Sequence, residues 1–188
     1  TTGTLNAASN NTGIGIAALD AITSGDANTA MGGNAGSAIN SGLNNTAVGN
    51  ATLFALSTGS NNTAIGKSSL QATTGSYNIG IGYTSGINIS SGDGNIIIGD
   101  VDADSATGDR QLKIAGFDGS TRTTWISGDN AGNLTFAGDV TVGDDLNLTT
   151  DSTVINFGAD SDTTLTHTDG AGLTLNSTNK LMFNDASQ

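Results

Sequence analysis

The pentapeptide NTAIG at residues 62–66 has five relatives in the same chain, at an almost constant spacing. NTGIG, NTAMG and NTAVG precede it at intervals of 17 residues, and NIGIG and NIIIG follow it after 16 and 17 residues. The copies begin at Asn11, Asn28, Asn45, Asn62, Asn78 and Asn95, and they end at Gly15, Gly32, Gly49, Gly66, Gly82 and Gly99. A fixed period of this kind indicates a repeat architecture.

Within each copy, bulky and small side chains alternate. In an extended strand, Thr63 and Ile65 share one face and Ala64 lies on the other. The bulky apolar position is filled by Ile14, Met31, Val48, Ile65, Ile81 and Ile98. We expect this bulky face to be the buried one, and the small face to be a place where another backbone approaches closely.

The remainder of each unit contains a second apolar segment and a turn such as Ser24-Gly25 or Ser41-Gly42. The segments are too short for helices, and Gly, Asn, Ser and Thr dominate them. We interpret each unit as two short strands and two turns, with Asn and Gly of the pentapeptide as turn residues. The sequence therefore predicts an all-β chain with a lead-in at residues 1–10 and a parallel β-solenoid or β-roll of 17-residue coils at residues 11–99.

The composition narrows the class of protein. The 188 residues include 28 Gly and 17 acidic residues, all of them Asp, but no Pro and no Cys, so disulfides and thiolate metal sites are excluded. Only 35% of residues are hydrophobic and 4% aromatic, which favours a slender rod whose apolar face is shared among chains, as an intertwined homotrimer or a higher polymer. The chain begins without Met, so we expect a processed or truncated piece.

The charge pattern argues against two classes of partner. The net charge is −12 and the five basic residues stand apart, so binding to nucleic acid is not expected. No apolar run reaches 18 residues, so membrane insertion is not expected either.

The second half departs from the repeat. Residues 100–111 (DVDADSATGDRQ) form an acidic connection, and residues 112–188 contain short strand signals separated by Gly, Asp and Asn turns. The signals after residue 138 lie at residues 140–142, 146–148, 153–157, 164–168, 173–175 and 180–183. We expect a β-rich fibre shaft over residues 112–188.

The tandem NTAIG coils resemble the head domains of trimeric autotransporter adhesins, which carry a similar S-V-A-I-G motif. LKIAGFDGSTRTTWISGDNAGNLTFAGDVTVGDDLNL (112–148) and TLTHTDGAGLTLNSTNKLMFNDASQ (164–188) resemble segments of tail fibres from marine and other environmental phages. The resemblance implies a homotrimeric fibre that displays or constitutes an adhesin, located in the virion or, alternatively, at a bacterial cell surface. No catalytic motif comes with it.

Few residues suggest chemistry. Asp100, Asp102 and Asp104 alternate, and their carboxylates suggest a calcium site within one chain or between chains. Trp125 is the single Trp and could be a core residue, an interchain plug or a platform for a sugar. His167, the single His, could bind metal on a threefold axis, although a surface or packed side chain is the simpler interpretation.

The sequence suggests three functions, in decreasing order of preference. The first is a non-enzymatic phage tail-fibre segment that forms a rod and supports or mediates attachment to a cell-surface glycan or protein receptor. The second is a bacterial extracellular adhesin or self-assembling surface filament. The third is a glycan-degrading or ice-binding solenoid, the latter because Thr12, Thr29, Thr46 and Thr63 would stack in a ladder.

Overall fold

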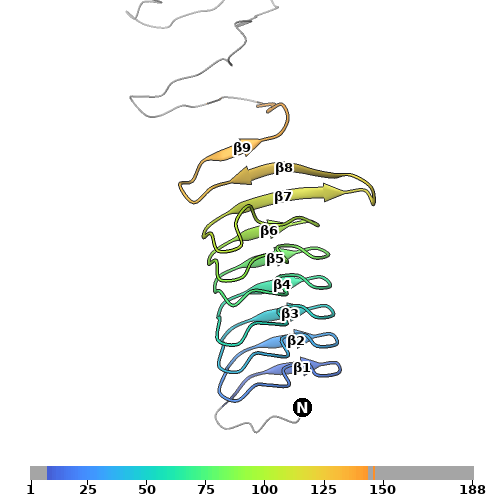
Figure 1. Ribbon diagram of the computed structural model, residues 1–188, viewed down its shortest axis with the longest axis vertical. Helices are drawn as coiled ribbons and strands as arrows, with labels where there is room; N and C mark the ends of the chain where they lie inside the picture. The colour runs from blue at the N-terminus through green and yellow to red at the C-terminus, as the bar shows by residue number, and fades with distance from the viewer. Residues whose placement is uncertain (1–7, 144–145, 147–188) are drawn as a thin grey trace, which may run out of the picture. The chain divides into compact units, whose positions relative to one another are not determined.

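The computed structural model describes residues 8–143 and 146, and within them the chain is all-β, without a helix. Nine strands form one sheet in sequence order, so that each strand lies beside the next one along the chain (Figure 1). The strands are β1 (Thr12–Ile14), β2 (Thr29–Met31), β3 (Thr46–Val48), β4 (Thr63–Ile65), β5 (Ile79–Ile81), β6 (Ile96–Ile98), β7 (Leu112–Phe117), β8 (Arg122–Gly128) and β9 (Leu134–Phe136).

The first seven strands are parallel and in register with the repeat. Thr63 of β4 pairs with Thr46 of β3 on one side and Ile79 of β5 on the other, and offsets of 16 or 17 residues recur along the stack. Each coil therefore returns to the same place one strand spacing further on, about 4.8 Å. This confirms the predicted β-solenoid of 17-residue coils.

The prediction of which strand face is buried was wrong. Ala30, Ala47 and Ala64 are completely buried, whereas Ile65 is 41% exposed. The small side chain points into the coil because the opposite wall is close: a Cβ on Gly80 would lie 2.6 Å from Ser69 Oγ. The bulky side chains point away from the coil interior.

The opposite wall of the coil is built from turns, and not from the second strand that we expected. Leu53 and Leu70 have φ of 50° and 48°, in the left-handed region, yet both are completely buried. Left-handed backbone is costly for a residue with a Cβ, and burial of the leucine side chain offsets that cost. Leucine and isoleucine from this wall fill the interior opposite the alanines.

The Asn that opens each repeat after the first is a buried ladder residue, which corrects its assignment to a turn. Asn62 Nδ2 donates to Asn45 Oδ1 and to the Gly75 carbonyl oxygen, each at 3.0 Å. Its own Oδ1 accepts from the Asn78 backbone N–H at 2.9 Å. Each amide thus joins its coil to both neighbours, which satisfies its polar atoms without water.

The coil stack continues past Gly99, through the segment predicted to be a connection. Gln111 takes the ladder position after Asn95, whose Oδ1 accepts from the Gln111 backbone N–H at 2.9 Å. Val101 and Ala103 are buried, and β7 pairs in parallel with β6. The side chain of Lys113 stands where Ile97 stood one coil earlier and reaches Asp104 at 2.8 Å, so an ion pair closes this end of the interior.

Beyond β7 the chain changes to an antiparallel meander of β8 and β9. Residues 140–142, predicted as a strand, form none, because no described segment pairs with them. Of the segment 146–148 only Leu146 is described, and the later predicted strands and His167 lie outside the described residues.

Candidate functional site

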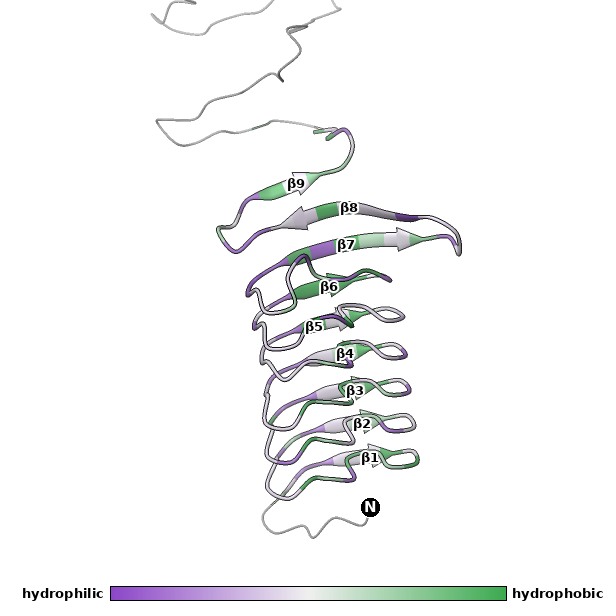
Figure 2. Ribbon diagram, viewed as in Figure 1, coloured by the Kyte–Doolittle hydropathy of each residue, from purple (hydrophilic) through white to green (hydrophobic). Residues whose placement is uncertain are grey.

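The outward face of the sheet carries a continuous row of bulky apolar side chains. The pairing places Ile14, Met31, Val48, Ile65, Ile81 and Ile98 in line and extends the line through Ile114 to Ile126 and Phe136. Hydrophobic colour accordingly recurs at the same place in successive strands (Figure 2). We call this row, together with the parallel row beside it, the outer face.

The second row of the outer face changes along the stack. It begins with the threonine ladder Thr12, Thr29, Thr46 and Thr63 and continues with Ile79, Ile96 and Leu112. The ladder therefore points outward with the apolar row, and it gives way to aliphatic side chains from β5 onward. Neither row contains a charged residue.

The outer face consists of apolar and hydroxyl side chains, which suit association with another surface. Ile14 remains 55% exposed and Phe136 47% exposed, so hydrocarbon faces solvent at both ends of the sheet. Contiguous exposed apolar surface on a soluble protein usually marks an interaction site.

Trp125 lies on this side of the sheet, near the β7–β8 turn. A Cβ on Gly116 would come within 2.6 Å of two atoms of the indole, so the ring rests directly on the Gly116 backbone. It is 55% exposed and is therefore not a core residue of its own chain. Its exposure agrees with the two other predicted roles, a contact between chains or a platform for a ligand.

The three alternating aspartates are directed to different partners. Asp100 forms an ion pair with Arg122 at 2.8 Å, Asp104 pairs with Lys113, and Asp102 accepts from the Asn88 backbone N–H at 3.3 Å. No group of three or more acidic or histidine side chains that could hold a metal occurs among the residues that the structure describes. Calcium binding by Asp100, Asp102 and Asp104 stays a prediction.

Two other aspartates organise the turns of the meander. Asp118 accepts from the backbone N–H groups of Ser120 and Thr121, and Asp129 accepts from the side chain and backbone of Asn133. These hydrogen bonds favour the charged carboxylate and lower the pKa of both groups below the ordinary value of 3.8.

The lowered pKa of Asp129 predicts acid sensitivity of the β8–β9 turn. A depressed pKa stabilises the folded turn above the unfolded value, and this contribution is lost as the pH falls through the folded value. We expect amide hydrogen exchange at Gly132 and Asn133, corrected for the intrinsic rate, to accelerate below pH 4 in the wild type. Asp129→Asn should already show faster exchange at neutral pH, and equal protection in both proteins at neutral pH would contradict the role of the carboxylate.

Comparison of the chain with protein-family models, with curated proteins and with solved structures found no match. Within the described part of the chain, no helix is long and apolar enough to cross a membrane. The outer face is therefore the feature of this chain from which a function can be argued.

Proposed function

We propose that this chain is a non-enzymatic structural fibre module that associates with further copies of itself through the outer face, as a homotrimer. The observation that carries the proposal is the uncharged apolar row that crosses all nine strands. Solvent contact of this row is unfavourable by about 25 cal/mol for each Å² of apolar surface, so a partner that covers it is stabilising.

The periodicity of the outer face favours a second copy as its partner. The apolar row advances by one side chain for each coil, at the strand spacing of about 4.8 Å. A partner whose side chains advance by the same step matches the row over its whole length, and this chain carries such a row. The absence of charge from both rows removes like-charge repulsion between identical surfaces.

The biological setting follows from the sequence resemblance. Fibre-like segments at 112–148 and 164–188 support a phage tail fibre that holds or forms an attachment site for a cell-surface receptor. A bacterial extracellular adhesin or surface filament is the alternative, since it uses the same kind of coil. Both settings require that the chain associates with copies of itself, and light scattering on the purified chain tests this. A trimer or polymer supports self-association, and a monomer of 18.5 kDa contradicts it.

Ile65→Asp tests the outer face directly. It places a carboxylate in the middle of the row without touching the coil interior, because Ile65 points outward. Burial of the charge between chains is costly, so we expect association to weaken about 100-fold or more while the circular dichroism spectrum of the folded coil is retained. Sedimentation velocity over a concentration series measures both states.

Asn44→Asp is the matched control for that variant. Asn44 is exposed, lies outside the outer face and has φ of 57°, a conformation that aspartate also tolerates. It adds the same charge, so it should leave association unchanged. Equal weakening by both variants would assign the effect to net charge and would contradict the proposed interface.

A further inference from the structure

A second feature of the coils lies at the corner that precedes each strand. One residue before each ladder amide, the backbone adopts left-handed φ in every coil. We call these positions the corner column: Asn10, Ala27, Asn44, Asn61, Tyr77, Gly94 and Arg110. Asn and Gly favour this conformation, and they occupy four of the seven positions.

Tyr77 is one of three exceptions, with Ala27 and Arg110, and it carries the only aromatic ring of the corner column. It has φ of 60°, which is unusual for a bulky residue, and it is 65% exposed. Within the part of the chain that the structure describes, its phenol makes no hydrogen bond and its ring no aromatic or cationic contact. The strained backbone thus holds an aromatic ring in solvent, where it contributes no such contact to the fold.

The next position of the corner column, Gly94, leaves a space beside the Tyr77 ring. Gly94 has no side chain, and Arg110 follows one coil later, with its Cγ 3.6 Å from the position that a Gly94 Cβ would take. Together with Asp93 and Asp109 these residues line a surface hollow of about 370 Å³. The hollow is shallow and open to solvent, so it can contact a ligand from one side.

The two aspartates of the hollow are held in place by the neighbouring coils. Asp93 Oδ1 accepts from the Ser76 backbone N–H at 2.6 Å, and Asp109 Oδ1 accepts from the Asp93 backbone N–H at 2.8 Å. No partner for either Oδ2 occurs among residues 8–143 and 146. Each carboxylate is therefore oriented by one oxygen and retains the other as an acceptor.

We infer that this hollow binds a neutral sugar residue of a glycan. The apolar C–H face of a pyranose stacks on the Tyr77 ring, and its hydroxyl groups donate to Asp93 and Asp109. The Arg110 guanidinium donates to a hydroxyl or ring oxygen on the far side of the hollow. This inference names the ligand class for the attachment role, and in that respect it rests on the proposed function.

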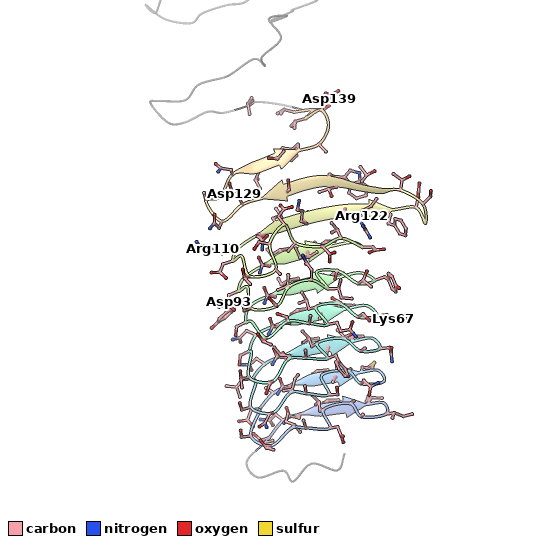
Figure 3. The ribbon with its side chains drawn as sticks, in the orientation of Figure 1. Lys67, Asp93, Arg110, Arg122, Asp129 and Asp139 are labelled. Atoms are coloured by element: carbon pink, nitrogen blue, oxygen red, sulfur yellow. The ribbon has the colours of Figure 1, made fainter. Side chains whose placement is uncertain are left out.

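The hollow combines acceptors and donors that a sugar can use together. Its two carboxylates repel phosphate and other anions, whereas its net charge of −1 makes a simple cation the competing ligand. A hydroxyl group can donate to the carboxylates and accept from the guanidinium, so a sugar satisfies both kinds of group. Asp93 and Arg110 lie at the stack edge opposite Lys67, and the corner column belongs to neither row of the outer face (Figure 3).

Saturation-transfer NMR on the full chain tests the inference with galactose, glucose, mannose, fucose and rhamnose as single-sugar probes. We expect transfer to at least one probe, and binding about tenfold weaker or worse in Tyr77→Asn. Asparagine occupies the same position in three other coils, so this variant should fold. Asp93→Asn should also weaken binding, since it keeps the acceptor for Ser76 N–H and removes the charge.

Tyr83→Ala is the matched control. Tyr83 is similarly exposed at 56%, but it lies against Lys67 and outside the hollow. The inference is overturned if no probe binds, if Tyr83→Ala weakens binding as much as Tyr77→Asn, or if tetramethylammonium competes with the sugar. Light scattering of Tyr77→Asn separates this result from the fibre proposal, because its association should equal that of the wild type.

Discussion

Replacing Asn62 with alanine is expected to lower the free energy of unfolding by about 3 kcal/mol or more. The substitution removes the donor to the Gly75 carbonyl and the acceptor for the Asn78 backbone N–H, both in the buried interior. Each buried group left without a partner costs about 1–3 kcal/mol, and the lost side-chain volume adds a cavity.

Asn50→Ala is the control for this result. Asn50 lies in the neighbouring coil and also donates to a carbonyl one coil away, Gly33, at 3.1 Å, but it is exposed. Water replaces that hydrogen bond, so the expected loss is at most about 0.5 kcal/mol. Urea unfolding at one fixed protein concentration compares the two, and equal losses would show that the ladder adds nothing beyond an ordinary surface hydrogen bond.

Gly66→Ala is expected to be at least as damaging, through the backbone itself. Gly66 has φ of +123°, which side-chain-bearing residues rarely adopt, and a Cβ there would collide with the Gly82 carbonyl of the next coil. The collision is with backbone, so no side-chain rotation relieves it. We expect a loss of about 3 kcal/mol or more, measured as a lowered midpoint of thermal unfolding.

Gly138→Ala provides the comparison, because a Cβ at that position meets no atom within 4 Å and the backbone φ is not left-handed. It should leave the midpoint unchanged. A Gly66→Ala protein that melts with the wild type would show that neighbouring coils separate easily, contrary to the close stacking in the structure.

The period and the strands could be predicted from the sequence. The spacing of the pentapeptide copies gives the period, and the alternation within each copy gives the strand. β4 occupies Thr63 to Ile65, the alternating part of NTAIG, and the strands of the five other pentapeptides occupy the same positions. Alternation fixes that Ala64 and Ile65 lie on opposite faces. It does not fix which face is inside, because the interior of a coil this narrow is set by the wall across from the strand.

A second apolar set was the signal that could have given the correct orientation. Leu53 and Leu56 follow the glycine in the same unit and also need burial. A narrow coil accommodates leucine from one wall only if the other wall contributes alanine, which places Ala64 inside and Ile65 outside. The left-handed backbone of Leu53 could not be foreseen, since it is held by packing and not by local preference.

The candidate sites were less predictable than the fold. Trp125 was singled out by its rarity, mainly as a core or interchain residue and also as a platform for a sugar, but its contact with Gly116 depends on pairing across the β7–β8 hairpin. Tyr77 and Arg110 are 33 positions apart in the sequence, and only the stacking of coils brings them to one hollow. The additional coil was not predicted because Gln111 stands where the other coils have Asn. Its side chain ends in the same amide group, so the ladder continues although the residue type changes.

The ladder also bears on how such a chain can change during evolution. The backbone N–H of each ladder residue from Asn28 to Gln111 donates to the side-chain oxygen of the ladder amide one coil before it, so interior coils present similar surfaces. Duplication or loss of 51 nucleotides, one 17-residue unit, therefore leaves this hydrogen bond available at the junction. The length of the roll is thus a trait that recombination can adjust in steps of about 4.8 Å, while the sequences at both ends stay as they are.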